Sequence, residues 1–469
     1  MLHRIRFVSA QPDEPYFIWQ CHVYLQNFVS LGIPARNCIA LFGLDPGERP
    51  SNALHALRAH FPDVDIRGYE DTRDDVGRAY PPSIQPHLIA RALRDSPELE
   101  GAPTFFHDSD IAFRRLPDFE RMLREHPRAC VLSETVESIG FERLMRNGRK
   151  IRAERPEIPE SELVDKMCAI VGIDVELVRR NQRGSGGAQY LLQGVGRSYW
   201  EKVYDDSVAL RRFFDDYFGR LRLQKHPTQL VWTAGMWAYL WNLWLAGLET
   251  VVHPEMTFVF GPGRSAARVE AATTIHMTAH GPFDKLEWRD LSPIDAVQRQ
   301  PFLFDHYPAS SIAREYAVMI HAAAGVQPRF DEPPRPARMW RVLAWPTRRQ
   351  GELWHVDEVQ FRFEPGVSTT DHFVSGGATR PFAPISGPVS VEHSSGCRPC
   401  FYLGVTLDRA AVPEQIAITQ RGGPHRAEIA LVQYNLDGAR WLTTLVARLD
   451  AGTATQLLEV SAGHDTLSG

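Results

Sequence analysis

Short β-branched or aromatic segments alternate with helical segments through the first 135 residues, and this alternation constrains the fold more than any other feature of the sequence. Strand-like segments cover residues 5–9, 38–42, 64–68, 104–107 and 129–133, and helical segments cover residues 19–31, 53–61, 86–93 and 119–125. Strands that alternate with helices favour a mostly parallel sheet with helices on both faces. The chain is therefore predicted to begin with an α/β domain of Rossmann-like type.

Helical patterns dominate the next part of the chain, at residues 161–172, 197–221 and 227–246, and strand character returns at 251–259 and 273–276. We interpret these segments as a helical insertion that completes one domain over residues 1–326. The apolar stretch 230–248 is long enough to cross a bilayer. It contains Thr233 and Asn242 and lacks flanking anchor residues, which favours a buried core helix.

A second domain is predicted after a proline-rich segment. Residues 327–336 contain four prolines, which cannot sustain a helix or a central strand, so a linker is predicted over 327–338. Beyond it the pattern is all-β, with turn residues at short intervals, which predicts a β-sandwich over 339–469. The predicted strands cover residues 340–345, 356–363, 401–407, 415–420, 429–434 and 445–449.

Composition and charge argue against several classes of protein. The hydrophobic share of 43% and the charged share of 23% are typical of globular domains. A formal net charge of −5 gives no reason to expect a nucleic-acid partner. The first residues hold no apolar run typical of a signal peptide, and the one close cysteine pair, Cys397 and Cys400, lacks histidines at zinc spacing. We therefore expect a cytoplasmic protein without a membrane span.

The segment 102–113, APTFFHDSDIAF, is the most informative for chemistry. An apolar strand leads directly into an Asp-x-Asp motif, and in an extended chain Asp108 and Asp110 share a face that His107 and Ser109 do not. Two carboxylates at the carboxyl end of a strand suit Mn²⁺ or Mg²⁺, which bind carboxylates together with phosphate oxygens. Such an ion would offset charge on a leaving diphosphate. The alternative is a polar turn without a metal.

Two histidines four residues apart, His276 and His280, lie in the segment 274–282, TIHMTAHGP. A neutral imidazole is a good metal ligand and is costly to bury without a partner. We predict His276 as the third metal ligand and place His280 at the nucleotide-sugar site. The alternative is a structural or surface histidine. No acidic residue follows His276, so the zinc-protease pattern is absent.

A glycine-rich segment, 184–193, reads GSGGAQYLLQ. Glycines allow the backbone to approach a ligand closely, so Gly187 is assigned to donor binding together with Ser109. Gln189 is predicted to hydrogen-bond sugar hydroxyls as the catalytic side chain. The sequence contains no P-loop, no GxGxxG after its first strand and no GxSxG elbow. The nearby aromatic residues are interpreted as core rather than as a sugar platform: Trp232, Trp237, Tyr239 and Trp241.

Four segments in this order, HDSDIAF, GAQYLLQGV, WTAGMWAYLWN and IHMTAHG, resemble the peptide O-glycosyltransferases of plants and algae and related bacterial proteins. That group comprises hydroxyproline O-arabinosyltransferases and peptidyl-serine α-galactosyltransferases. The resemblance covers residues 1–290 and implies a GT-A fold, a UDP-sugar donor, Mn²⁺ and retaining transfer. Asp108 and Asp110 match the family's metal motif, and His276 matches its late histidine. Gly235 departs from the family, which often has an acidic residue there, so the resemblance implies no acceptor-side carboxylate at this position.

The C-terminal part resembles the discoidin-type sandwich, also called coagulation factor type C. The resemblance rests on four segments, WRV from residue 340, VQFRF from 359, YLGVTL from 402 and LVQYNLDGARW from 431. It implies sugar binding through loops at one end of the sandwich. A purely structural appendage is the alternative.

These observations together predict a metal-dependent glycosyltransferase that moves a hexose or pentose from a UDP-sugar to a hydroxyl group of a peptide or glycan. A different class of protein, a non-catalytic carbohydrate-binding protein on a degenerate transferase scaffold, is the first alternative, motivated by Gly235. A metal-dependent hydrolase is the second alternative, and it would cleave the diphosphate without a sugar acceptor.

Overall fold

The computed structural model describes the chain except residues 1, 224–227, 260–265, 279–282, 284, 300–302, 305–306, 308–310, 327–333, 347–352, 375–385, 393–400, 421–426, 437–440, 450–454 and 461–469. It divides into two compact units, Met1–Lys285 and Leu286–Gly469. Helices α14 (Pro293–Arg299) and α15 (Ile312–Ala323) belong to the second unit, although the predicted boundary at residue 326 assigns them to the first domain. Most of the predicted linker 327–338, and both Cys397 and Cys400, lie outside the described residues.

The first unit contains a seven-stranded sheet in the order β3-β2-β1-β4-β7-β6-β8. Neighbouring strands from β3 to β4 are parallel, as are β6 and β8, whereas β7 runs antiparallel to both of its neighbours. The predicted mostly parallel sheet is confirmed, and the sequence analysis missed the short strand β7. The strands are β1 (Arg6–Pro12), β2 (Cys38–Leu44), β3 (Asp65–Glu70), β4 (Thr104–Phe106), β6 (Ala129–Leu132), β7 (Tyr190–Leu192) and β8 (Glu249–Val252).

Helices cover both faces of this sheet because its buried strands send alternate side chains to opposite sides. Phe7 and Phe105 belong to one hydrophobic cluster, with residues of α1 (Pro15–Ser30), α2 (Asn52–His60) and α5 (Phe119–Glu125). Val8 and Phe106, one residue further along, belong to the other cluster, with residues of α4 (Ile84–Asp95) and of the helical insertion.

The helical insertion forms much of the second core. It comprises α6 (Val136–Ile139), α7 (Phe141–Glu154), α8 (Glu162–Val171), α9 (Val175–Arg180), α10 (Arg197–Leu221), α11 (Thr228–Trp232) and α12 (Ala234–Leu245). The predicted helix 227–246 is two helices, broken at Thr233. Trp237, Tyr239 and Trp241 of α12 are buried, which confirms their assignment to the core. Trp232, the last residue of α11, is 59% exposed, so its assignment to the core was wrong. Among the residues that the structure describes, no helix has the length and apolarity needed to cross a membrane.

A small second sheet lies beside the first in the order β5-β10-β9, where β5 is Ile111–Phe113, β9 is Phe258–Val259 and β10 is Thr274–His276. The predicted strand 251–259 is therefore two strands in different sheets. The chain between β8 and β9 turns through a 3₁₀ helix, Pro254–Met256, where proline at the first position favours a turn over a continued strand. Two short helices, α3 (Asp75–Ala79) and α13 (Ala266–Ala271), complete the first unit.

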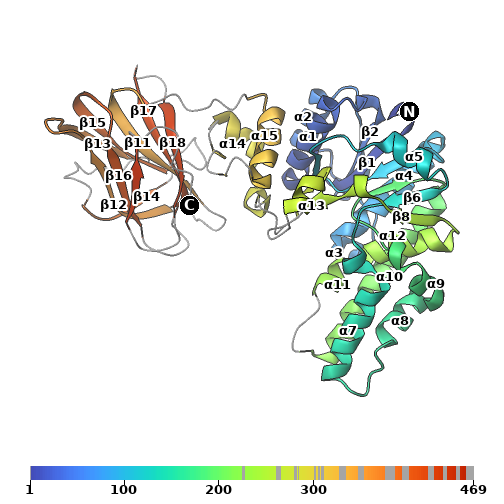
Figure 1. Cartoon of the computed structure of the whole chain (residues 1–469). Helices are drawn as coiled ribbons and strands as arrows, with labels where there is room; N and C mark the ends of the chain where they lie inside the picture. Colours follow the sequence, from blue (N-terminus) through green and yellow to red (C-terminus); the bar gives the residue numbers. More distant parts are fainter. Residues whose placement is uncertain are drawn as a thin grey trace. The chain divides into compact units, whose positions relative to one another are not determined.

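The second unit contains a β-sandwich, as predicted. Its five-stranded sheet has the order β13-β15-β11-β17-β18 and its four-stranded sheet has the order β14-β12-β16-β19, with antiparallel pairs throughout (Figure 1). Both sheets contribute to one core around Trp340. The strands are β11 (Ala337–Pro346), β12 (Leu353–Arg362), β13 (Thr369–Val374), β14 (Ser386–Glu392), β15 (Phe401–Ala411), β16 (Gln415–Gln420), β17 (Ala427–Asn435), β18 (Trp441–Arg448) and β19 (Gln456–Glu459).

Candidate functional site

Strand pairing brings the predicted metal ligands together. Asp108 and Asp110 lie in the loop between β4, in the large sheet, and β5, in the small sheet. β10 pairs antiparallel with β5 in a register that sets His276 opposite Ile111, and the backbone N–H of Met277 donates to the carbonyl oxygen of Asp110 at 2.8 Å. This register places His276 beside the Asp-x-Asp motif although about 170 residues separate them in the sequence.

The three side chains converge on one point. The Nε2 atom of His276 lies 3.4 Å from Oδ2 of Asp108 and 3.2 Å from Oδ1 of Asp110. One ligand atom from each residue lies within 4.8 Å of the others. Oδ1 of Asp110 is buried, and among the described residues no donor, His276 at 3.2 Å included, reaches it with hydrogen-bond geometry. A buried carboxylate oxygen without a well-aligned hydrogen bond, beside a second carboxylate and an imidazole, fits a divalent cation such as Mn²⁺. That these residues hold an ion stays a prediction.

Lys285 is a fourth member of this cluster, and the sequence analysis missed it. Its side chain is buried, its Nζ atom contacts Oδ2 of Asp110, and it lies 5.7 Å from the ring centroid of Tyr16 in α1. The one signal in the sequence was the choice of lysine itself, because the chain has only five lysines among its 52 basic residues. Lysine serves as a compact point charge toward phosphate.

Opposite charges dominate the electrostatics of this cluster. Burial alone would raise the pKa of Asp110, but Lys285 and His276 outweigh burial and hold it well below its ordinary range. Burial would likewise lower the pKa of His276, but Asp110 and Asp108 raise it to about 9. The pKa of Lys285 is raised by Asp110 in spite of burial. In the metal-free protein His276 and Lys285 are therefore the cations that neutralise the two carboxylates.

Asp108 and Asp110 differ in access to solvent. The side chain of Asp108 is 38% exposed, whereas that of Asp110 is 7% exposed. Nε2 of Gln85, from α4, donates to Oδ1 of Asp108 at 2.6 Å, and the hydroxyl of Tyr239 donates to Oε1 of Gln85 at 3.3 Å. Asp108 is thus held by Gln85 on one side, and the other side of its carboxylate is open to solvent.

Gln189 lies behind His276, which the sequence analysis did not anticipate. Its side chain is 1% exposed, its Nε2 atom lies 3.1 Å from Nδ1 of His276, and its Oε1 atom lies 2.7 Å from the hydroxyl of Ser133. The preceding residue, Ala188, has a φ of 72°, a left-handed conformation that is unfavourable for any residue with a Cβ atom. Gln189 is therefore placed to act through His276, and its predicted contact with a sugar stays a prediction.

The other residues assigned to donor binding have different surroundings. Ser109 faces away from the two carboxylates, and its hydroxyl donates to Oε1 of Gln20 in α1 at 3.1 Å. Gly187 is buried, and a Cβ atom there would lie 2.9 Å from both the Tyr190 hydroxyl and the Cε atom of Met236. His280 lies outside the described residues. The donor contacts predicted for these three residues stay predictions.

Gly235, the departure from the family pattern, lies at the start of α12. Its N–H donates to the hydroxyl of Tyr80 at 2.8 Å, and this hydroxyl donates to the carbonyl oxygen of Trp232 at 2.7 Å. A Cβ atom at Gly235 would lie 3.3 Å from the same hydroxyl. A larger acidic side chain would crowd Tyr80, so the absence of a side chain here accommodates the packing of Tyr80 against α12.

A second group with metal-ligand chemistry, Glu125, His126 and His253, lies elsewhere in the first unit. Nδ1 of His253 accepts a hydrogen bond from the backbone N–H of Glu255 at 3.1 Å, so Nε2 carries the proton and points at Glu125, 3.4 Å away. An imidazole nitrogen that carries a proton cannot bind a metal. In this arrangement His253 is a neutral imidazole that caps the 3₁₀ helix, hydrogen-bonds Glu125 and offers no free ring nitrogen to a metal.

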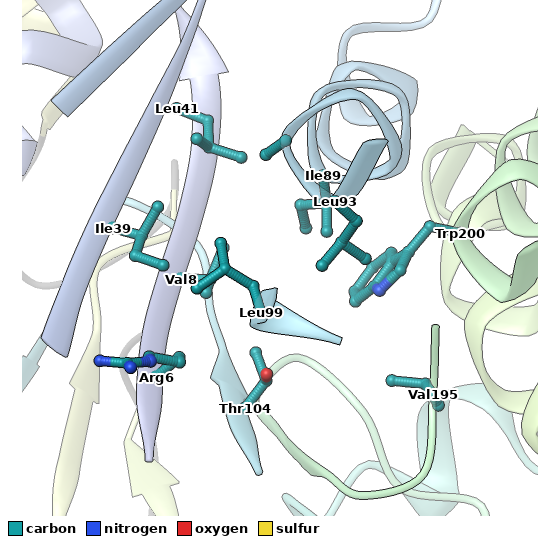
Figure 2. Close-up of a pocket in the computed structure, with 11 residues that line it drawn as sticks. Arg6, Val8, Ile39, Leu41, Ile89, Leu93, Leu99, Thr104, Val195 and Trp200 are labelled. Carbon is teal, nitrogen blue, oxygen red and sulfur yellow. The ribbon is translucent and has the colours of Figure 1, made fainter. Parts of the chain in front are cut away.

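The cavity in Figure 2 lies toward the amino ends of β1 and β4, away from the carboxyl end of β4 that leads to Asp108. Its volume is about 30 Å³, and its lining includes Arg6 and Thr104, the first residues of β1 and β4, together with Trp200 of α10. The remaining lining is mainly aliphatic, from β1, β2 and α4 (Figure 2). The candidate metal ligands follow the carboxyl end of β4, where open α/β sheets bind ligands, so the cavity is separate from that site.

Comparisons with known proteins identify no family. No protein-family model and no curated protein matches the chain. Among solved structures, the chain is similar to the bifunctional glycosyltransferase WbbM at 12% identity and a TM-score of 0.33, covering 64% of this chain and half of WbbM. It is also similar to mouse xyloside xylosyltransferase 1, at 9% identity, a TM-score of 0.30 and coverages of 60% and 99%.

A third similar structure is the galactosyltransferase LgtC in complex with donor and acceptor sugar analogues. Its identity is 12%, its TM-score is 0.31, and the match covers 68% of this chain and 95% of LgtC. Similarities of this size carry no argument about function, which has to come from the site itself.

Proposed function

We propose that the first unit is a GT-A glycosyltransferase that transfers a sugar from a UDP-sugar to a hydroxyl group of a peptide or glycan, with retention of configuration. The observation that carries the proposal is the convergence of Asp108, Asp110 and His276 beyond the carboxyl end of β4, where Oδ1 of Asp110 is buried and makes no well-aligned hydrogen bond to the described residues. A set of two carboxylates and one imidazole suits Mn²⁺ or Mg²⁺ more than a thiolate-preferring metal.

Asp108, Asp110 and His276 would hold the metal, which when bound supplies Lewis-acid stabilisation of negative charge on a diphosphate. The open side of Asp108 leaves room for phosphate oxygens. Lys285 neutralises Asp110 in the metal-free protein, and a divalent cation there would free its ammonium group for the diphosphate. Two sources of positive charge beside a departing diphosphate would lower the barrier to its departure.

The reaction breaks the bond between the anomeric carbon of the donor sugar and the diphosphate oxygen, and forms a bond between that carbon and the acceptor oxygen. The acceptor hydroxyl loses its proton, and the diphosphate oxygen is the nearest base that the reaction itself creates. In this proposal the chain would bind the diphosphate through Lys285 and through the ion that Asp108, Asp110 and His276 would hold, and it keeps His276 in place through Gln189.

A donor screen tests this proposal. UDP release is measured from UDP-glucose, UDP-galactose, UDP-N-acetylglucosamine, UDP-xylose and UDP-arabinose, with Mn²⁺ or with a chelator, and with or without peptide and glycan acceptors. The proposal expects release that depends on Mn²⁺ and rises with an acceptor. A hydrolase would release UDP at a rate that acceptors do not change, and a non-catalytic binding protein would release none with any donor.

A further inference from the structure

The five-stranded sheet of the second unit carries a positive charge between aromatic rings. Arg341 lies on β11, and its guanidinium carbon is 4.8 Å from the ring centroid of Tyr402 and 4.1 Å from that of Trp441. Its Nε atom donates to Oε1 of Gln433 at 2.8 Å, and Nε2 of Gln433 donates to the hydroxyl of Thr443 at 2.9 Å. These contacts hold the guanidinium group in one orientation.

This side chain points away from the core of the sandwich. Trp340 and Val342, on either side of Arg341, belong to the buried cluster between the two sheets, so Arg341 lies on the opposite face. Gly404 pairs with both Arg341 and Phe373. A Cβ atom at Gly404 would lie 2.3 Å from the ring of Phe373, so only glycine lets this ring lie across β15.

Phe373 completes a cluster with the two other rings. Its ring centroid lies 6.2 Å from that of Tyr402 and 5.7 Å from that of Trp441. We call Arg341, Phe373, Tyr402 and Trp441 the arginine–aromatic cluster. All four side chains are half-buried, so each keeps some surface open to solvent.

Within the part of the chain that the structure describes, the charge of Arg341 has no counter-ion. Among the described residues, no carboxylate forms an ion pair with Arg341, and Gln433 is the one hydrogen-bond acceptor of its guanidinium group. Burial lowers the pKa of Arg341 to about 10, an effect that only Tyr402 opposes. The two terminal nitrogens of its guanidinium group have no hydrogen-bond partner among the described residues, and they are not buried, so they are open to solvent. A partly desolvated cation without an anion is costly, and an anionic ligand would offset that cost.

We propose that the arginine–aromatic cluster binds a hexuronic acid residue of a glycan. The free edge of a guanidinium group is planar and matches the two oxygens of a carboxylate. The three rings beside it offer apolar surface against which the C–H face of a pyranose can pack. A hexuronic acid presents both features on one rigid ring. This site lies within the second unit and does not depend on the function proposed for the first.

The test uses the full chain and a tetramer of galacturonic acid, with binding measured by calorimetry at low salt. The same tetramer with its carboxylates reduced to alcohols is the matched ligand. We expect binding of the acidic tetramer and none, or at least about tenfold weaker binding, of the reduced one. Arg341→Met and Trp441→Leu should each weaken binding about tenfold or more, and Arg341→Lys should also weaken it because lysine lacks the planar edge.

Arg409→Met is the control, because Arg409 is an exposed arginine of β15 in the same sheet and pairs with Glu364 at 3.4 Å. It removes the same charge and should leave binding unchanged. Melting curves confirm that each variant is folded. Three results would overturn the proposal: no binding of the acidic tetramer, equal binding of the reduced tetramer, or equal losses in Arg409→Met and Arg341→Met. Equal binding of a tetraglutamate peptide would also overturn it, because any carboxylate would then suffice.

Discussion

The Nδ1 atom of His276 lies 3.1 Å from the side-chain amide of Gln189, on the side of the ring opposite Asp108 and Asp110. Nδ1 carries a proton both in an imidazolium ion and in an imidazole whose Nε2 atom binds a metal. In either state the side-chain carbonyl oxygen of Gln189 has to accept the hydrogen bond from Nδ1. The amide nitrogen of Gln189 then faces the hydroxyl of Ser133, which lies 2.7 Å from the other end of the side-chain amide. Gln189 is thus a positioning residue for His276.

Substitutions at Gln189 should change metal affinity in opposite directions. Gln189→Glu supplies a carboxylate that accepts from both Nδ1 of His276 and the hydroxyl of Ser133, so we expect Mn²⁺ to bind more tightly. Gln189→Met has a similar shape and no acceptor, and it should weaken Mn²⁺ binding about tenfold or more. Calorimetric titration of Mn²⁺ without nucleotide measures both. Equal affinities in the two variants would remove the positioning role.

Lys285→Met should uncouple metal binding from catalysis. In the wild type a metal has to displace Lys285 from Asp110, and the variant leaves Asp110 buried without that cation. We expect the metal-free variant to melt earlier, Mn²⁺ to raise its melting temperature more than that of the wild type, and sugar transfer to fall. The control is Lys202→Met, which removes a half-exposed lysine from its pair with Asp206. A smaller Mn²⁺ shift in Lys285→Met than in the wild type would contradict this account.

Metal binding should depend on pH through His276. Its pKa of about 9 in the metal-free protein lies above the ordinary value of 6.5, so at neutral pH the metal has to displace a proton. Apparent Mn²⁺ affinity should therefore rise with pH up to about 9, by about tenfold per pH unit at most for one proton. Between pH 6.5 and about 9 the folded metal-free protein keeps a proton on His276 that the unfolded chain has lost. The stability of the metal-free protein should therefore fall as pH rises through this range.

The measurement is Mn²⁺ calorimetry at neutral pH in buffers of different ionisation enthalpy, which counts the protons released. About one proton per ion is expected for the wild type and fewer for His276→Asn. If the wild type released no proton, the metal would not be replacing a proton on His276, which would contradict this account.

The sequence predicted long elements well and short ones poorly. The predicted helix at 197–221 coincides with the 25-residue α10, because a sustained helical pattern carries many residues of signal. β5 and β7 have three residues each, too few to show a period, and they were missed. The break at Thr233 was missed because the residues on both sides are apolar, and an apolar run looks the same in one helix as in two.

The candidate site was predictable where its chemistry lies within one segment. Asp108 and Asp110 follow a strand directly, and an alternating chain puts both on one face. The places of Lys285 and Gln189 depend on contacts between distant segments, because the pairing of β10 with β5 sets His276 against the Asp-x-Asp motif and Gln189 behind it. A motif of one segment carries no information on such contacts.

Binding of UDP in the presence and absence of Mn²⁺ tests the central claim, a metal-bridged diphosphate at Asp108, most directly. With wild-type protein, UDP with Mn²⁺ at about a hundredfold excess over its dissociation constant should stabilise the fold by about 2.7 kcal/mol, read as a rise in melting temperature. UDP with a chelator should raise it far less, and Asp108→Asn should lose the metal-dependent part. Equal shifts with Mn²⁺ and with chelator, or an unchanged shift in Asp108→Asn, would contradict the account.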